Sequence, residues 1–177
     1  MTGTGKDVLE LRLGGEEDTA RLGAALARVV APFAARAPFV VHLRGDLGAG
    51  KTTLARAWLA ALGHRGPVRS PTYTLVEAYQ GEGWRAWHLD LYRLADPGEL
   101  EMLGVRDLLA GPGLLLVEWP GRGGEGTPPA DLVLALSHGG SPGRRRARLE
   151  ARTARGAEAL GRLDPAPFRE RGGGEEG

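Results

Sequence analysis

The sequence has no cysteine among its 177 residues, which excludes disulfides, thiol catalysis and zinc sites built on thiolates. It also lacks a strong charge of either sign, since 23 basic residues face 22 acidic ones and the net charge is +1. The arginines are mostly interleaved with acids along the sequence, so we expect no direct binding to DNA or RNA. No long apolar run of membrane-spanning or signal-peptide type occurs, and we expect a cytoplasmic protein with no membrane partner.

Lysine is nearly absent, because Lys6 and Lys51 are the only two lysines in the sequence. Lys51 lies in the stretch GDLGAGKT at residues 45–52, which matches the phosphate-binding loop pattern GxxxxGK[ST]. An apolar run at 39–43 precedes the loop and an amphipathic run at 54–62 follows it, as the strand–loop–helix context of this motif requires. The sequence therefore predicts a nucleotide-binding site rather than a glycine-rich turn with a surface lysine.

The residue types of the loop fit phosphate chemistry. Its glycines permit positive φ, let backbone N–H groups approach phosphate oxygens, and open a helix whose dipole favours anions. Lys51 is expected to reach the β and γ phosphates, and the Thr52 hydroxyl to ligate Mg²⁺. Guanine-specific GTPases read their base with an Asn-Lys-x-Asp element, which a chain without asparagine cannot contain. ATP is therefore the favoured nucleotide.

The apolar pattern alternates between strand and helix periods, which is typical of an α/β fold. Strands are predicted at 8–13, 39–43, 74–79, 85–91, 114–117, 132–136 and 145–151, and helices at 19–35, 54–62, 96–103 and 154–163. We expect a P-loop NTPase-like mixed β-sheet flanked by helices, in a single domain over residues 1–164. Residues 165–177 lack apolar content and are predicted to be a disordered tail.

Two acidic residues end predicted strands and are candidates for metal binding and catalysis. Glu118 follows the apolar run 114–117, so it is expected at the carboxyl end of a central strand, as a Walker-B-like acid on Mg²⁺. A solvated strand-end glutamate is the alternative. Asp90 ends another strand and is a candidate to polarise the attacking water. A salt bridge with Arg93 or a helix cap is the alternative for Asp90.

Two further segments carry groups suited to phosphate. The hydroxyls of SPTYT at 70–74 follow the helix of the loop, where a segment responsive to the γ phosphate commonly lies, although a plain turn would have the same composition. The run Arg144-Arg145-Arg146 begins a predicted strand, so one arginine can point toward phosphates unless the run is a solvated cluster. His88 is interpreted as a structural residue of its strand.

The chain carries, in order, the segments GDLGAGKTT, SPTYTLV, HLDLYRL followed by DPGEL, and VEW. In this order and spacing they resemble the bacterial TsaE family, also called YjeE, over about Asp18 to Leu163. The resemblance implies a weak ATPase of the tRNA threonylcarbamoyladenosine machinery, with ATP and Mg²⁺ as cofactors. It also implies TsaD, which transfers threonylcarbamoyl to adenosine in tRNA, and its dimer partner TsaB as partners, with tRNA reached only through that complex.

The resemblance extends to individual residues. It implies catalytic roles for Asp90, Lys51 and Glu118, and Mg²⁺ ligation by Thr52 and Glu118. Matches to nucleotide-contacting positions are Thr19, Gly45, Asp46, Leu47, Gly48, Ala49, Gly50, Lys51, Thr52, Thr53, Thr72, Thr74, Asp90, Trp119 and Arg145. The neighbours of Arg145, Arg144 and Arg146, remain alternatives to it. Gly121 departs from the family, because many members have an acidic residue near that place, and this bears only on a peripheral contact.

Two other classes of protein use the same loop. A small-molecule kinase would transfer the phosphoryl group to a metabolite, but the chain has no clear arginine-rich lid insertion between Asp90 and Leu114. A nucleotide-binding adaptor would never hydrolyse ATP, and its binding would not depend on Asp90. Phosphate release measured against phosphate transfer to acceptors separates these hypotheses.

Overall fold

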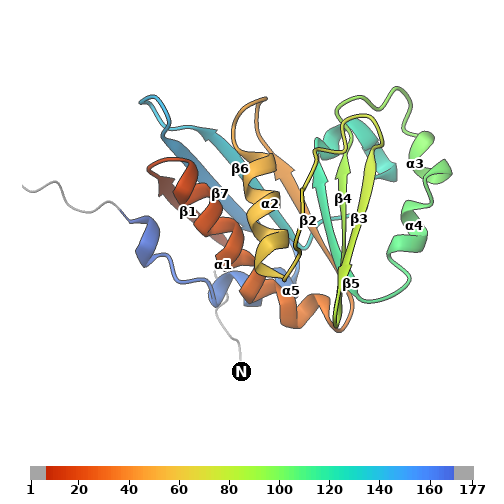
Figure 1. Cartoon of the computed structure of the whole chain (residues 1–177), viewed down its shortest axis with the longest axis horizontal. Coiled ribbons are helices and arrows are strands. Elements are labelled where there is room, and N and C mark those ends of the chain that lie inside the picture. Colours follow the sequence, from red (N-terminus) through yellow and green to blue (C-terminus); the bar gives the residue numbers. More distant parts are fainter. Residues whose placement is uncertain (1–6, 170–177) are drawn as a thin grey trace, which may run out of the picture.

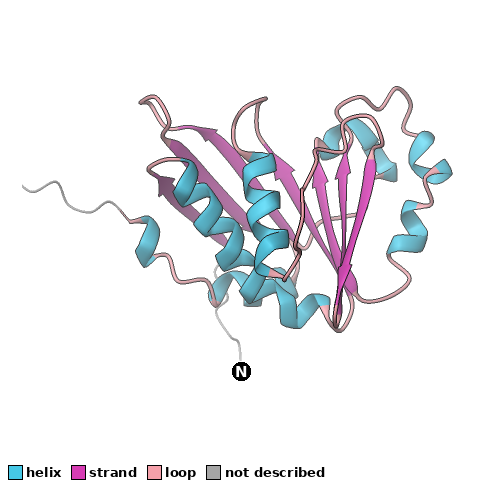
Figure 2. Cartoon of the chain, viewed as in Figure 1, coloured by secondary structure: helices cyan, strands magenta, loops and turns pink. Residues whose placement is uncertain are grey.

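The centre of the structure is a seven-stranded mixed sheet with the order β1-β7-β6-β2-β5-β4-β3 (Figure 1). The computed structural model describes residues 7–169. The strands are β1 (Val8–Leu13), β2 (Pro38–Arg44), β3 (Val76–Gly81), β4 (Trp84–Asp90), β5 (Gly113–Glu118), β6 (Leu132–His138) and β7 (Arg145–Ala151). The helices are α1 (Glu16–Ala34), α2 (Lys51–Ala61), α3 (Glu99–Met102), α4 (Val105–Leu108) and α5 (Ala154–Gly161). The predicted fold class, a single-domain α/β fold with a mixed sheet flanked by helices, is confirmed (Figure 2).

The four central strands β6, β2, β5 and β4 run parallel, whereas β7 is antiparallel to both its neighbours and β3 is antiparallel to β4. The carboxyl ends of parallel strands meet at one edge, where open α/β sheets bind their ligands. At this edge Asp90 pairs in register with Glu118, which in turn pairs with Leu43 of β2. The topology therefore brings both predicted site acids next to the loop that follows β2.

Apolar side chains cover both faces of the sheet. One cluster packs the sheet against α1, α2 and α5 and includes Leu26, Trp58 and Leu160. The other packs the opposite face against α3 and α4 and includes Leu100 and Val105. All residues of β5 are buried, as the continuous apolar run predicted for a central strand. The strand that presents Glu118 is thus fixed from both sides.

Helices α1 and α2 approach each other closely at Gly23. A Cβ atom at Gly23 would lie 2.5 Å from the carbonyl oxygen of Leu54, so only glycine fits this crossing. Thr19, one turn earlier in α1, is 2 % exposed, and its methyl carbon would lie 3.2 Å from a Cβ atom on Gly50. The close crossing therefore holds the start of α1 against the phosphate loop.

A buried carboxylate fixes β2, the strand that leads into the loop. The Asp131 carboxylate accepts the Val40 backbone N–H at 2.9 Å, the Thr153 hydroxyl at 2.8 Å and the Arg155 guanidinium at 3.1 Å. Arg155 also donates to the Pro38 carbonyl at 2.7 Å. Because a buried charge is tolerated only when it is paired and hydrogen-bonded, this network ties β2 and the start of β6 to α5.

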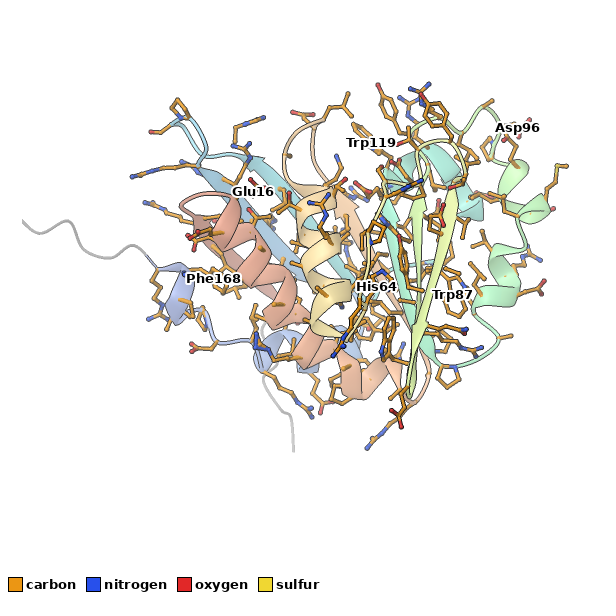
Figure 3. The ribbon with its side chains drawn as sticks, viewed as in Figure 1. Glu16, His64, Trp87, Asp96, Trp119 and Phe168 are labelled. Carbon is orange, nitrogen blue, oxygen red and sulfur yellow. The ribbon has the colours of Figure 1, made fainter. Side chains whose placement is uncertain are left out.

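Several local features differ from the predictions. Strand β3 starts at Val76, because Leu75 has a φ of 65° and cannot continue a strand. The expected helix at 96–103 is shorter, and α4 and a 3₁₀ segment at Pro120–Gly126 were not predicted. Phe168 is 3 % exposed within a 3₁₀ turn at Ala166–Phe168, so the first part of the expected tail packs on the fold (Figure 3).

Residues 1–6 and 170–177, the outer parts of the predicted domain and tail, lie outside the described residues. Among the helices of residues 7–169, none is long and apolar enough to cross a bilayer.

His42 in β2 is expected to make folding stability depend on pH. Its Nε2–H donates to the Pro128 carbonyl at 2.8 Å, but burial lowers the pKa of the imidazole below its ordinary value of about 6.5, and Arg44 and Arg152 add to this effect. Below the ordinary pKa, His42 binds a proton in the unfolded chain more readily than in the folded chain. The free energy of unfolding therefore falls as the pH drops.

We expect urea unfolding between pH 7 and 5 to show this loss in the wild-type chain and a flatter profile for His42→Gln. The exposed His138 provides the control, because His138→Gln should keep the wild-type profile. Equal slopes for His42→Gln and the wild type would contradict the assignment.

Candidate functional site

The loop between β2 and α2 has a backbone that requires its glycines. Gly45, Gly48 and Gly50 have φ values of 148°, 78° and 107°. A Cβ atom on Gly45 would also lie 2.6 Å from the carbonyl oxygen of Leu136. Gly50 precedes the first residue of α2, so the loop ends at a helix N-terminus whose N–H groups face the cavity above it. This arrangement is the strand–loop–helix unit that the sequence predicted.

A cavity of about 510 Å³ lies over this loop. It gathers residues from the loop, the start of α2, the segment after α2, and the ends of β4 and β5. Its lining residues are Asp46, Leu47, Gly48, Ala49, Gly50, Lys51, Thr52, Thr53, Ser70, Thr72, Asp90, Tyr92, Arg93, Glu118 and Trp119. Most of the predicted site residues therefore share one cavity.

Two acidic side chains stand side by side in this cavity. Asp90 is 6 % exposed and Glu118 is 2 % exposed. The Asp90 carboxylate accepts the Ser70 hydroxyl at 3.2 Å and the Tyr92 backbone N–H at 3.0 Å. Arg93 instead lies over the Tyr73 ring at 4.8 Å, so the salt-bridge alternative for Asp90 is not what the structure shows. Asp90 is held by hydrogen bonds that leave it facing the cavity.

Lys51 is folded back onto its own loop. Its ammonium group donates to the carbonyl oxygen of Gly45, and to that of Asp46 at 3.2 Å, and it lies 4.4 Å from the centre of the Trp119 ring. Burial lowers the pKa of Lys51, while Glu118, Asp90 and Asp46 act to raise it. A buried cation with weak partners has a strong preference for an anion, and a phosphate group would supply one.

Strained backbone flanks the cavity on two sides. Within residues 7–169, Leu75 and Trp119 are the non-glycine residues with positive φ, at 65° and 55°. Leu75 follows the Ser70–Thr74 segment, and Trp119 follows Glu118 and lies at the upper edge of the sheet in Figure 3. Such conformations persist where the surrounding structure enforces them, often at ligand sites. The Trp119 ring also contacts Tyr92, with ring centres 5.0 Å apart.

The remaining predicted residues lie around the loop or away from it. Gly45 is the first residue of the loop, and Thr19 packs against Gly50 from α1, but neither lines the cavity. Arg145 donates to the carbonyl oxygens of Ala49 at 3.2 Å and Gly48 at 3.1 Å, so of the three adjacent arginines it is the one bonded to the loop. Thr74 is exposed, bonds the Glu77 carboxylate at 3.1 Å and is not part of the cavity lining.

A second cavity, of about 450 Å³, shares Arg145 with the loop region. Its arginines come from β1, α1, β7 with the turn before it, and the segment after α5: Arg12, Arg21, Arg144, Arg145, Arg146 and Arg169. Arg144, Arg145 and Arg146 are consecutive in the sequence, and the fold brings Arg12, Arg21 and Arg169 to them from distant segments. The expectation that the arginines are dispersed holds along the sequence but not in space.

The donor set of the first cavity fits Mg²⁺ held together with phosphate. Glu118, Asp90 and the Thr52 hydroxyl supply oxygen ligands, which Mg²⁺ prefers. Within residues 7–169, no group of three or more His, Cys, Asp or Glu side chains could hold a metal ion by itself. This agrees with the common way in which Mg²⁺ binds, through one or two carboxylates plus substrate phosphates.

Sequence reasoning missed the polar partners behind the acids. The His88 Nε2 atom lies 2.7 Å from a carboxylate oxygen of Glu118, although His88 was interpreted as structural. The spacing in the sequence indicated that His88 lies near the site, because His88 and Asp90 are two residues apart on one strand and their side chains must lie on the same face of the sheet. The bond from Ser70 to Asp90 had no such signal, since it joins a loop to a strand end.

The fold and the loop together define a single-domain α/β protein with a P-loop NTPase-like sheet. Residues 13–147 match the family model described as "Threonylcarbamoyl adenosine biosynthesis protein TsaE". The chain is similar to proteins named "tRNA threonylcarbamoyladenosine biosynthesis protein TsaE". One, from Haemophilus influenzae, is 45 % identical over 118 residues, which is 67 % of this chain and 75 % of that protein. Another, from Aquifex aeolicus, is 38 % identical over 129 residues, 72 % of this chain and 85 % of that protein.

A solved structure agrees with this match. The crystal structure of YdiB from Bacillus subtilis superposes with a TM-score of 0.73 at 27 % identity, over 88 % of this chain and 93 % of that one. The chain belongs to the TsaE family.

Proposed function

We propose that this chain is a Mg²⁺-dependent ATPase that supports tRNA threonylcarbamoyladenosine modification with TsaD and TsaB, by resetting that complex between turnovers. The observation that carries the proposal is the convergence of Lys51, Thr52, Asp90 and Glu118 on one cavity over a phosphate-binding loop. Membership of the TsaE family supports the pathway, because relatives carry its name. A cytoplasmic location is part of the same proposal.

Binding of ATP would use groups that the cavity already presents. Backbone N–H groups of the loop and of the start of α2 would receive the phosphates. Lys51 would leave the carbonyl oxygens of Gly45 and Asp46 and pair with the β and γ phosphates, so that charged acceptors replace neutral ones. Arg145 would remain on the loop carbonyls of Gly48 and Ala49 and brace the loop.

Hydrolysis requires acids at the γ-phosphate end of the cavity. Bound Mg²⁺ would neutralise charge on the transferred phosphoryl group, and Thr52 and Glu118 are the residues that would hold it. The Asp90 carboxylate accepts hydrogen bonds from Ser70 and Tyr92, and it would orient a water molecule and accept its proton. Loss of either acid would reduce turnover more than ATP affinity.

The test is multiple-turnover modification of tRNA by TsaD and TsaB supplied with threonylcarbamoyl-adenylate, with phosphate release followed in parallel. The reactions contain no addition, the wild-type chain, Glu118→Ala, or Glu125→Ala, an exposed acidic residue that serves as the control. We expect the wild type and Glu125→Ala to stimulate modification and release phosphate, and Glu118→Ala to do neither.

Other outcomes would replace the proposal. If ATP is consumed and modification is unchanged by any form, the pathway assignment is wrong. Transfer of phosphate to a metabolite much faster than hydrolysis would establish the small-molecule kinase instead. Tight ATP binding with no hydrolysis, unaffected by loss of Asp90, would establish a nucleotide-binding adaptor.

A further inference from the structure

His88 is a fully buried polar residue directly behind the cavity. It lies in β4, two residues before Asp90, and pairs in register with Leu116, two residues before Glu118. Side chains two apart on a strand share a face, so His88 and Glu118 project to the same side of the sheet. This side is the one covered by α2. His88 therefore contacts Glu118 from the core between the sheet and α2, and not from the cavity.

The contact between the two side chains has a defined direction. The His88 Nε2 atom lies 2.7 Å from Oε2 of Glu118, with 0 % and 3 % of the two side chains exposed. A carboxylate accepts hydrogen bonds and has no proton to donate, so Nε2 is the donor. Within residues 7–169, Nδ1 of His88 is buried with no hydrogen-bond partner. The polar contact of this imidazole is thus made with Glu118 alone.

Core packing does not account for a histidine at this position. Burial of an imidazole with one nitrogen unpaired is less favourable than burial of an apolar side chain of similar volume. On this face of the sheet, apolar Ala86 and Leu116 lie on one side of His88. The acids Glu77, Asp90 and Glu118 share the same face, and Glu118 is the one that His88 contacts. A phenylalanine or leucine would fill the same space at lower cost, so the polar ring must serve the carboxylate that it contacts.

Glu118 needs such a support because β5 offers it none. Every other residue of β5 is apolar or glycine, and among the described residues His88 makes the one hydrogen bond to the Glu118 carboxylate. With Oε2 held by His88, Oε1 is the oxygen left for a ligand in the cavity. In metal sites, partners of this kind orient the ligating group, and their loss commonly lowers metal affinity by about 10- to 100-fold.

We propose that His88 is a positioning residue, which fixes the Glu118 carboxylate so that its free oxygen meets the metal ion bound with the nucleotide. This inference rests on the proposed function, because it requires that Glu118 face a metal–nucleotide complex. It assigns no contact between His88 and substrate. His88 acts through Glu118.

The test measures metal binding without turnover. Mn²⁺ serves as the probe, and its affinity is measured by electron paramagnetic resonance at saturating ADP. ADP affinity is measured separately in EDTA. His88→Phe keeps a ring of similar size and removes the donor, whereas His88→Gln keeps an N–H near the position of Nε2. His64→Phe is the matched control, because His64 also has a buried nitrogen without a partner but packs on Tyr79 away from the cavity.

We expect His88→Phe to lower Mn²⁺ affinity by about 10- to 100-fold while ADP affinity in EDTA stays unchanged. His88→Gln should restore Mn²⁺ affinity close to that of the wild type, and His64→Phe should not change it. Wild-type Mn²⁺ affinity in His88→Phe would overturn the inference. Equal loss in His88→Phe and His88→Gln, accompanied by weaker ADP binding in EDTA, would also overturn it and show a packing role.

Two further outcomes are distinguishable. If His88→Phe does not fold, His88→Leu takes its place under the same criteria. Glu118→Ala, which removes the carboxylate altogether, then sets the reference for a lost metal ligand. Mn²⁺ affinity as low in His88→Gln as in Glu118→Ala still overturns the inference. If the wild-type chain binds ADP but shows no ADP-dependent Mn²⁺ binding, the metal-dependent function itself is wrong, and the role of His88 falls with it.

Discussion

Replacement of Asp90 by asparagine is expected to lower the rate of ATP hydrolysis by about 10²- to 10⁴-fold, the usual contribution of a positioned general base. Asparagine keeps an oxygen that can accept the Tyr92 backbone N–H, so the strand end should remain folded. It lacks the negative charge and basicity that would draw a proton from water. ATP affinity should therefore change little, because the loop and Lys51 are the groups proposed to bind the phosphates.

The measurement is single-turnover phosphate release, together with the affinity for a non-hydrolysable ATP analogue in Mg²⁺. Asp107→Asn changes an exposed acid of α4 in the same way and should behave as the wild type. A wild-type hydrolysis rate in Asp90→Asn would show that the base assignment is wrong. A parallel loss of rate and analogue affinity would instead move Asp90 into the set of metal or nucleotide ligands.

Gly23→Val is expected to destabilise the fold by about 3 kcal/mol or more, at the upper end of overpacking effects. The new Cβ would lie 2.5 Å from the Leu54 carbonyl oxygen, which is backbone and cannot rotate away. The helices must therefore separate. Because α1 also holds Thr19 against Gly50, a folded fraction should bind ATP more weakly than the wild type.

Urea unfolding and ATP titration of the same samples test both parts of this prediction. Gly121→Val is the control, since no atom lies within 4 Å of a Cβ at that glycine and its backbone does not have a positive φ. Unchanged stability in Gly23→Val would show that the α1–α2 crossing has room to adjust. Lower stability with normal ATP affinity would separate the crossing from the loop.

The sequence predicted helices and strands well where the apolar pattern is long and the flanking residues indicate the same element. The strands at 8–13 and 145–151 have the predicted bounds, and α1 and the buried strand at 114–117 differ by only a few residues at their ends. These segments bury one face or both, so the pattern of apolar residues reports their structure directly. The glycine-rich loop between β2 and α2 was equally accessible, because its backbone conformation depends on consecutive residues.

Features that depend on contacts between distant segments were not predictable in the same way. Leu75 looks like a strand residue, yet its positive φ is set by its contacts, with its N–H bonded to Pro71 and its carbonyl to Asp90. Phe168 has no other large apolar residue beside it in the segment after Leu163, so no periodic pattern indicated that it is buried. In the arginine-lined cavity only the run at 144–146 is visible in the sequence, because Arg12, Arg21 and Arg169 join it from distant segments of the described chain.

The pairing of β1 with β7 has a consequence for synthesis of the protein on the ribosome. Of the described strands, β1 is translated first and its hydrogen-bonding partner β7 last, and Leu13 pairs with Arg145 itself. One edge of the sheet therefore stays open until β7 has been translated, as expected for a topology dominated by distant pairings. The strand–loop–helix unit around Gly50 is translated long before this. The hydrogen bond from Arg145 to this loop can form only after β7 has joined the sheet.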